Sequence, residues 1–265
     1  MDDHNNNSSE TGFNLYQAYS YSLLLQVESS SFSYAFVNQD RLLVSAQNCD
    51  FDELAHPKHL SEILTATYKK VIIGLPATGL TLVPKNLFRT DRVADVARLL
   101  DVKETERVFA QAFDDENCIV YKTPGYVASA VEKFGFQNTV YTAKGWIKAI
   151  SKNCPSTDHL YLEIGKSQLQ IAYFSGNILR FYNIFEFKNE EDVVYFTTLV
   201  TDELHLKPNQ TTLVLSGDVL PDDRNMKRLA EFFPKIELNS VRVLSLPGQV
   251  PSYKVLSLAA LSLCE

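Results

Sequence analysis

The chain has 265 residues, of which 45% are hydrophobic and 22% are charged, as expected for a globular protein with one large core or two smaller ones. Its formal net charge is −7 and it has no cluster of lysine or arginine residues, which argues against nucleic acid as a partner. No run approaches the roughly 18 consecutive apolar residues of a membrane-spanning helix, so we expect no direct membrane insertion.

The N-terminal stretch, MDDHNNNSSETG, is polar and acidic, whereas a secretory signal begins with basic residues followed by an apolar run. We therefore expect residues 1–14 to form a disordered N-terminus and the protein to be cytoplasmic. The four cysteines are far apart and form no CxxC pair, as is typical of reduced thiols in such a compartment: Cys49, Cys118, Cys154 and Cys264.

The first strongly patterned region predicts a three-stranded meander, with strands at 23–27, 32–37 and 41–45. His56 and His59 follow as an HxxH pair, but Pro57 lies between them and no third ligand is near. We interpret both histidines as surface residues before a helix that begins near His59, and we predict no metal site. That helix leads into a buried strand that ends at Gly74.

The middle of the chain predicts a strand at 118–122, a helix at 125–134, a strand at 139–143 and a helix from Trp146 onward. Residues 153–158, NCPSTD, are a candidate hinge. A second meander follows, with strands at 160–164, 169–174 and 178–187, then a helix at 191–206 and a strand that ends at Gly217. The acids at 190–192 and 222–223 are placed as the first turns of helices.

The tripeptide Gly165-Lys166-Ser167 resembles the end of a Walker phosphate-binding loop. That motif needs a glycine at position 160, which is Leu160, and a helix after the serine. The residues that follow Ser167 are LQIAYF, which is a strand pattern. We therefore place the tripeptide in a β-hairpin turn.

The two meanders are copies of one unit. Residues 25–44 align without gaps with residues 162–181, at a constant offset of 137, and the apolar and polar classes agree at nearly every pair. In each copy a helix follows the meander and leads into a further strand. These strands end at Gly74 and Gly217, which are separated by nearly the same offset. The sequence therefore predicts a duplicated, two-lobed α/β protein with a first lobe at 15–153 and a second lobe at 154–265.

This order of elements, repeated twice, resembles the actin-like ATPase superfamily, which includes actin, the ATPase domain of the heat-shock chaperones, sugar kinases, FtsA, PilM and GspL. The stretches that carry the resemblance are LQVESSSFSYAFV, LEIGKSQLQIAYF and LVLSGDV. The segment IIGLPATGLTLVPKNLF is similar to a bacterial family of actin-like proteins of unknown function. The resemblance implies a ribonuclease H-like fold with mixed five-stranded sheets flanked by helices.

In that superfamily the two hairpins clasp the phosphates of ATP with Asp-x-Gly turns, in which the acid orients Mg²⁺ and the glycine lets backbone N–H groups approach. In the first copy the corresponding residues are Gln26 and Glu28. A carboxylate about 4 Å from a phosphate charge is repelled by roughly 4 kcal/mol at an effective dielectric near 20. The first hairpin has therefore lost both features of the motif.

The second copy has Glu163 and Gly165 at these places, with Lys166 and Ser167 beside them as groups that can hold an anion. The adenosine-binding Gly-Gly pair of the superfamily corresponds to Gly217 followed by an aspartate. The candidate vestigial nucleotide site comprises seven residues: Glu163, Gly165, Lys166, Ser167, Gly217, Gln26 and Glu28.

We interpret the chain as a non-catalytic or degenerate actin-like protein, a cytoplasmic interaction or scaffold protein with a protein partner and no cofactor. The alternative is a nucleotide-binding ATPase or kinase-like protein that binds Mg-ATP in the interlobe cleft. A third reading is recognition of a small acidic metabolite at Lys166. Lys122 or Arg180, which lie outside these motifs, could also replace the binding groups that the motifs lack and so restore a site in the cleft.

Overall fold

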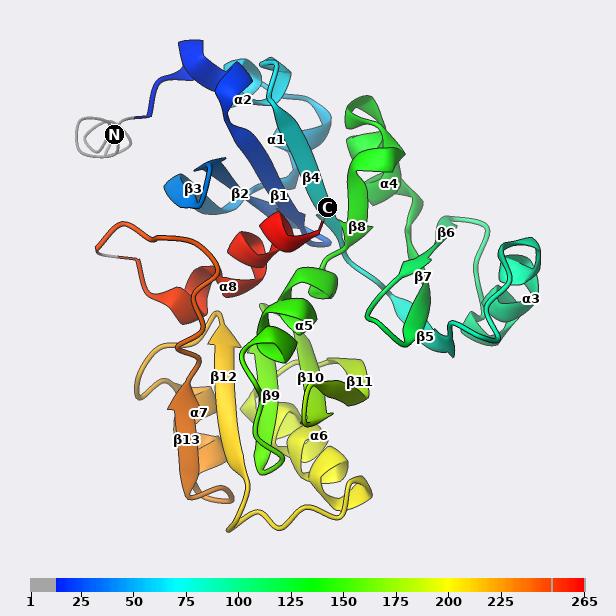
Figure 1. Ribbon diagram of the computed structural model, residues 1–265, viewed down its shortest axis with the longest axis vertical. Helices are drawn as coiled ribbons and strands as arrows, with labels where there is room; N and C mark the ends of the chain where they lie inside the picture. Colours follow the sequence, from blue (N-terminus) through cyan, green and yellow to red (C-terminus); the bar gives the residue numbers. More distant parts are fainter. Residues whose placement is uncertain (1–12, 249, 265) are drawn as a thin grey trace. The chain divides into compact units, whose positions relative to one another are not determined.

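The computed structural model describes residues 13–248 and 250–264, so the expectation for residues 1–14 lies almost entirely outside the described residues. The chain forms two compact units (Figure 1). Unit 1 comprises Met1–Trp146, Val243–Gln249 and Ser257–Glu265, and unit 2 comprises Ile147–Arg242 and Val250–Leu256. Two of the four boundaries between the units fall inside helices, α5 (Ala143–Lys152) and α8 (Ser252–Ala260).

Unit 1 contains a mixed five-stranded sheet of order β3-β2-β1-β4-β8. Its strands are β1 (Ser22–Val27), β2 (Ser31–Asn38), β3 (Arg41–Asp50), β4 (Lys70–Leu75) and β8 (Thr139–Tyr141). The first three form the predicted antiparallel meander, and β4 and β8 join it in parallel. The fold class predicted from the sequence is confirmed for this unit.

Unit 1 also contains several short helices. The α-helices are α1 (Phe51–Ala55), α2 (Ser61–Thr65), α3 (Val93–Ala97) and α4 (Gly125–Val131), and the 3-10 helices are η1 (Leu15–Ser20), η2 (Thr90–Arg92), η3 (Arg98–Leu100), η4 (Glu132–Phe134), η5 (Phe136–Asn138) and η6 (Leu261–Leu263). The helix expected from His59 begins only at Ser61, because the Glu53 carboxylate accepts the backbone N–H groups of residues 58–60 and holds them in a loop. His56 and His59 are exposed there, as predicted.

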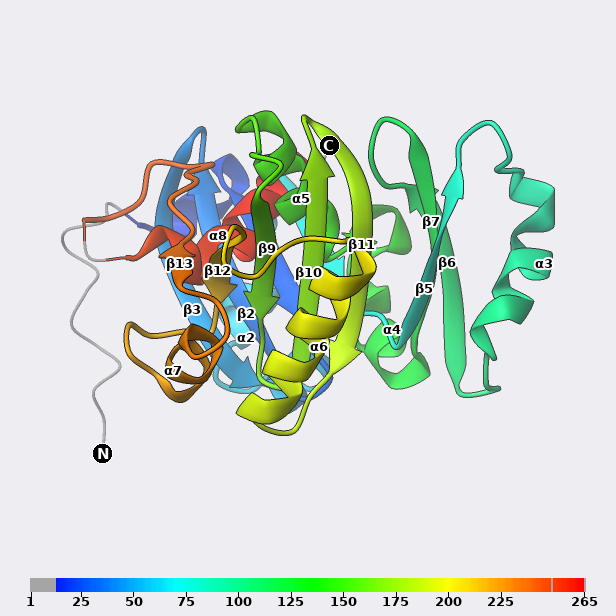
Figure 2. The ribbon, with the colours of Figure 1, turned by 90° about the horizontal axis from the view of Figure 1, so that it is seen from below.

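Unit 1 also contains a three-stranded antiparallel sheet of order β5-β7-β6, beside α3 (Figure 2). Its strands are β5 (Gly79–Pro84), β6 (Glu106–Ala112) and β7 (Asn117–Pro124). The sequence analysis predicted a strand only for β7, whose central residues are buried. The two outer strands are partly exposed, so they lack the strong apolar pattern that identifies a strand.

A buried ion pair joins the strands of this small sheet. Lys122 Nζ lies 2.9 Å from Glu106 Oε2 and also donates to the Asp101 carbonyl, and both charged side chains are only 10% exposed. Thr78 Oγ1 and the backbone N–H of Lys103 donate to the same carboxylate. Burial alone would raise the pKa of the Glu106 carboxyl, but these hydrogen bonds and the Lys122 charge outweigh it and hold the pKa at about 2.

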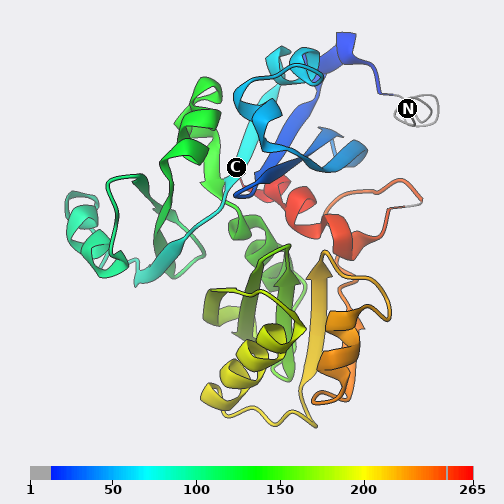
Figure 3. The ribbon, with the colours of Figure 1, turned by 180° about the vertical axis from the view of Figure 1, so that it is seen from behind.

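Unit 2 is built like the first sheet of unit 1, in the order β11-β10-β9-β12-β13. Its strands are β9 (His159–Ile164), β10 (Gln168–Ser175), β11 (Ile178–Glu186), β12 (Thr212–Gly217) and β13 (Lys235–Leu238). The helices α6 (Glu190–Glu203) and α7 (Arg224–Ala230) cover one face of this sheet (Figure 3). The core between them is formed by side chains such as Leu162, Val193, Leu215 and Phe233, all fully buried.

The duplication is reproduced strand by strand. The bounds of β9 and β10 equal those of β1 and β2 shifted by the offset of 137 residues seen in the sequence. One part of the alignment was wrong by a residue. Gly74 pairs with Gln26 in unit 1, whereas the neighbour of Glu163 in unit 2 is Ser216 and not Gly217. The two glycines are therefore not equivalent: the chain from Glu163 to Ser216 is five residues longer than that from Gln26 to Gly74 (53 against 48), and equivalent glycines would need six.

The C-terminal segment also differs from the expectation that all of 154–265 belongs to the second lobe. Residues 243–249 and 257–265 belong to unit 1. Leu244, Leu258 and Leu261 are buried in one core with Leu24 and Leu42 of the first meander, which explains this return of the chain.

Replacement of Lys122 by methionine should destabilise the protein by about 3 kcal/mol, because it leaves the Glu106 carboxylate buried without its cation. The matched control is Lys85→Met, a change at an exposed lysine of the same sheet region, which should cost less than about 0.5 kcal/mol. Urea unfolding measures both. Equal stabilities of the two variants would show that the pair does not hold this sheet.

The Glu106 carboxyl should also make stability depend on pH. Its folded pKa of about 2 lies below the unfolded value near 4.3, so its contribution is present above about pH 4.3 and is lost as the pH falls toward 2. The free energy of unfolding of the wild type should therefore fall more steeply across this window than that of Glu106→Gln. Parallel slopes in acid denaturation would contradict the assignment.

Candidate functional site

The two hairpin turns that the sequence singled out have the same backbone geometry. In unit 1 the N–H of Glu28 donates to the carbonyl of Ser31 at 2.9 Å. In unit 2 the N–H of Gly165 donates to the carbonyl of Gln168, also at 2.9 Å. These donors and acceptors are equivalent at the offset of 137 residues. The predicted placement of Gly165, Lys166 and Ser167 in a hairpin turn is therefore confirmed.

In unit 1, side chains complete the turn. Ser31 Oγ donates to Glu28 Oε2 at 2.9 Å, so the carboxylate stays at the turn instead of extending into solvent. The hydroxyl of Tyr126, on α4, donates to the Ser29 carbonyl at 2.9 Å. Gln26 is half-buried on β1, beside Ser33 and the Gly74 backbone. The turn of unit 1 thus presents a carboxylate where the resemblance expects a glycine.

In unit 2, Glu163 lies on β9 between Gln170 of β10 and Ser216 of β12. It is 6% exposed and alternates along the strand with Leu162 and Ile164, so it lies on the sheet face opposite to the α6–α7 core. Lys166 and Ser167 are exposed at the tip of the turn. An anion at this turn would meet one lysine and one hydroxyl, with a buried carboxylate three residues before the lysine.

Gly217 ends β12 in a left-handed conformation, with φ of +93°. A Cβ on this residue would lie 2.3 Å from the carbonyl oxygen of Ile164, which is closer than any real contact. The next N–H, of Asp218, donates to the same carbonyl at 2.7 Å. Contact between β12 and β9 therefore accounts for this glycine without any ligand.

A buried polar pair beside Glu163 was not found from the sequence. Asn239 is 2% exposed and donates from Nδ2 to Ser216 Oγ at 3.1 Å. Its Oδ1 accepts the N–H of Val241, and its carbonyl accepts the Ser252 hydroxyl. The only sequence signal is a polar residue directly after the strand KIEL, and such residues are common in turns. This pair fixes the chain where β13 ends.

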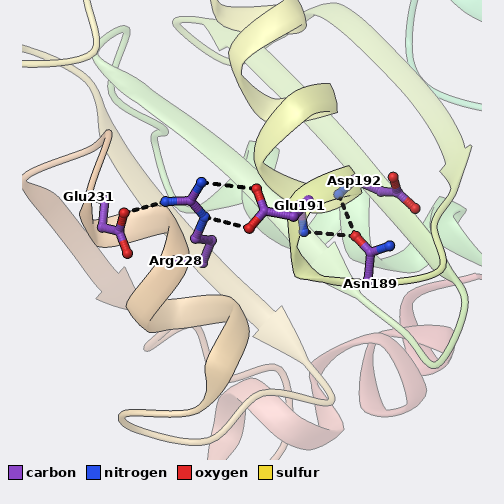
Figure 4. Close-up of polar contacts among 5 residues, drawn as sticks. All are labelled: Asn189, Glu191, Asp192, Arg228 and Glu231. Carbon is purple, nitrogen blue, oxygen red and sulfur yellow. Dashed lines mark hydrogen bonds and ion pairs between the residues drawn. The ribbon is translucent and has the colours of Figure 1, made fainter.

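The acids at the start of α6 are in the first turn of a helix, as predicted (Figure 4). Asn189 caps the helix by accepting the N–H groups of Glu191 and Asp192. Arg228 of α7 donates two hydrogen bonds to Glu191 and also bonds Glu231. The hydrogen bonds with Arg228 lower the pKa of the Glu191 carboxyl. The network joins α6 to α7.

The start of α7 also matches the expectation in part. Asp223 is its N-cap and accepts the N–H of Met226 at 2.8 Å. Asp222 precedes the helix in a left-handed conformation, with φ of +64°. Both acids therefore precede the first turn, in which they were expected, and Asp223 alone caps the helix. No group of three His, Cys, Asp or Glu side chains that could hold a metal occurs among the described residues.

A surface hollow of about 530 Å³ lies beside the turn of unit 2. It is lined by residues from the turn, from the end of β11 and from α6: Ser167, Glu186, Phe187, Lys188, Asp192 and Phe196. The Phe185 and Phe196 rings stack at 4.7 Å and support its apolar wall. Of the motif residues predicted from the sequence, only Ser167 lines this hollow.

The two basic residues considered as further cleft residues have different positions. Lys122 is held in the ion pair with Glu106 and is 8% exposed, so its charge is already neutralised inside the small sheet of unit 1. Arg180 is exposed on β11 of unit 2. The structure therefore groups Glu163, Gly165, Lys166, Ser167 and Gly217 in unit 2, and Gln26 with Glu28 in unit 1.

Gly217→Ala should destabilise the protein by about 3 kcal/mol, because it adds both left-handed strain and a clash with the Ile164 carbonyl. Gly176→Ala is the matched control in the same unit. Gly176 has φ of +59° with no atom within 4 Å of the added Cβ, so only the strain of about 1 kcal/mol applies. Thermal and urea unfolding compare the two variants, and equal losses would remove the packing explanation for Gly217.

Comparison with solved structures identifies the fold. A protein with an actin-like ATPase fold and unknown function from Bacteroides thetaiotaomicron aligns with a TM-score of 0.78 at 18% identity, over 96% of this chain and 99% of that one. The PilM–PilN type IV pilus biogenesis complex aligns with a TM-score of 0.60 at 13% identity, over 92% of this chain and 98% of that one. The ethanolamine utilization protein EutJ from Carboxydothermus hydrogenoformans has a TM-score of 0.49 at 8% identity, over 91% and 89% of the two chains.

No curated protein matches this chain. Among the described residues, no helix is long and apolar enough to cross a membrane. The resemblance to actin-like proteins is confirmed at the level of the fold. Residues 8–236 match the family described as "Protein of unknown function (DUF3822)". Since these residues make up most of the chain, the protein belongs to that family and has the actin-like ATPase fold.

Proposed function

We propose that this protein is a non-catalytic member of the actin-like group, which acts in the cytoplasm as an interaction or scaffold protein for a protein partner and does not use Mg-ATP. The observation that carries the proposal is the Glu28 carboxylate in the turn of unit 1, held there by the Ser31 hydroxyl. The resemblance places a phosphate beside this turn, and a negative charge held there would repel a triphosphate.

The residues of the other turn support the same proposal. Gly217, the surviving glycine of the adenosine motif, is accounted for by its contact with Ile164, and the exposed residue after it is an aspartate. A Cβ at Gly165 would lie 3.3 Å from the Gln168 carbonyl, which is a tight contact, although the equivalent turn of unit 1 has Glu28 at this place. The residues present thus fit the demands of the fold better than those of Mg-ATP.

Two further observations support a cytoplasmic protein with a protein partner. Among the described residues, the four cysteines form no disulfide, which agrees with a reducing compartment. The solved structure of PilM is a complex with PilN, so a protein of this fold and similar length binds a protein. That likeness concerns the fold alone, and it supports the partner as a proposal.

Titration of the purified protein with Mg-ATP by isothermal calorimetry tests this function. We expect no saturable heat at millimolar nucleotide and no phosphate release above that of buffer, because the Glu28 charge opposes the triphosphate. The control titrations use inorganic phosphate and a dicarboxylic acid, which report anion binding at Lys166 without a nucleotide.

Saturable Mg-ATP binding that is lost in Lys166→Ala would overturn the proposal in favour of a nucleotide-binding protein. Lys152→Ala, at an exposed lysine of the same unit, is the matched control for charge. Binding of phosphate or a dicarboxylate without Mg-ATP binding would instead identify recognition of a small anion, and this result too would replace the scaffold function.

A further inference from the structure

The outer face of α6 exposes apolar side chains in the centre of a helix. Tyr195 is 61% exposed and Leu199, one turn later, is 39% exposed. Phe232 lies in the turn that follows α7 and is 45% exposed. Arg228 of α7 contacts its ring and also bonds Glu191 of α6, which places Phe232 beside the start of α6. Large apolar side chains of α6 and of this turn thus face solvent.

Acidic residues surround these apolar side chains. The helix α6 contains five acids and no lysine or arginine, with Glu190, Glu191 and Asp192 in its first turn and Asp202 and Glu203 in its last. The first three favour the helix, but acids in the last turn oppose its dipole. Both acids of the last turn are exposed. The fold does not need them, which points to a role outside the fold.

The hollow beside the turn extends this surface at the start of α6. Phe187 and Phe196 give it an apolar wall, and Glu186 and Asp192 give it two carboxylates against the single ammonium of Lys188. Such a hollow suits a lysine or arginine side chain, whose methylene stem contacts aromatic rings while its cation lies near carboxylates. Lys166 is the neighbour of Ser167 in the turn, and Arg228 of α7 is already bound to Glu191 and Glu231.

We propose that this surface, defined by the outer face of α6 with Phe232 and the hollow beside Ser167, is the docking site for a basic amphipathic helix of a partner protein. The apolar stripe of that helix covers Tyr195, Leu199 and Phe232, and its basic residues lie at the acids of both ends of α6, about 20 Å apart. The proposal rests on the interaction function proposed above and specifies where the partner binds and with what chemistry.

Charge complementarity decides among the occupants of this surface. A second copy of the same face would bring five acids of one helix against five of another, and like charges across an interface are unfavourable. A nucleic acid or an anionic lipid surface meets the same repulsion. A basic helix is the occupant that satisfies both the apolar and the charged residues.

The probes are three synthetic peptides of about 18 residues, long enough to span α6. The first is a leucine–lysine peptide with apolar residues at helical spacing. The second replaces every lysine by glutamate, and the third has the composition of the first in a scrambled, non-amphipathic order. Binding to the full chain is measured by calorimetry, and backbone amide shifts in NMR spectra locate it. We expect saturable binding of the first peptide alone, with shifts confined to α6, residues 186–188 and the end of α7.

The variant Asp202→Lys/Glu203→Lys separates binding from folding. It should weaken binding of the basic peptide by at least about tenfold. Its melting temperature should be no lower than that of the wild type, because cations favour the last turn of a helix. Tyr195→Ala should weaken binding to a similar degree. Glu104→Lys/Glu116→Lys is the matched control, since it changes the net charge equally at exposed acids of unit 1 and should leave binding unchanged.

The docking site is overturned if no peptide binds, if the glutamate peptide binds as well as the basic one, or if the shifts map outside this surface. Unchanged affinity in the Asp202→Lys/Glu203→Lys variant also overturns it. A dimer of the free chain that Tyr195→Ala converts to a monomer would assign the face to a second copy instead. None of these outcomes affects the Mg-ATP titration, so failure of the docking site and failure of the proposed function are distinguishable.

Discussion

Each five-stranded sheet depends on one arrangement, in which the first strand of a hairpin pairs with its antiparallel neighbour on one side and with a parallel crossover strand on the other. In unit 2 this arrangement brings the end of β12 against the end of β9, so closely that Gly217 has no room for a Cβ beside the Ile164 carbonyl. The turn between β9 and β10 starts at that point. The backbone alone therefore places a turn and a strand end together, whatever side chains the turn carries.

Because the backbone is independent of the turn side chains, the fold persists when those side chains change. The N–H to carbonyl hydrogen bond that closes each turn is identical in the two units, although one turn has Glu28 where the other has Gly165. A glycine is not required by the backbone at this position, so a carboxylate is tolerated in the turn of unit 1. The same frame can thus support phosphate binding in one protein and a different interaction in another.

The repeated meanders could be predicted because buried strands give an alternating or a continuous apolar pattern. The same pattern also occurs in both copies, which strengthens the prediction. The sequence did not predict β5 and β6, whose residues are half-exposed, nor the start of α2 at Ser61, which depends on three hydrogen bonds to Glu53. The return of residues 257–264 to unit 1 depends on contacts with Leu24 and Leu42, more than 200 residues away, which no local pattern contains. At the candidate site, the sequence predicted the hairpin turn at residues 165–167, but the packing reason for Gly217 and the Asn239–Ser216 pair needed coordinates.

We propose that the two hairpin turns keep the same backbone geometry but bind no nucleotide. Hydrogen–deuterium exchange of the full chain, with and without millimolar Mg-ATP, tests it at the amides concerned. The account predicts the same exchange rates at residues 26–31 and 163–168 in both conditions. Slower exchange at both turns in the presence of Mg-ATP would show that they hold the nucleotide, and would contradict the account.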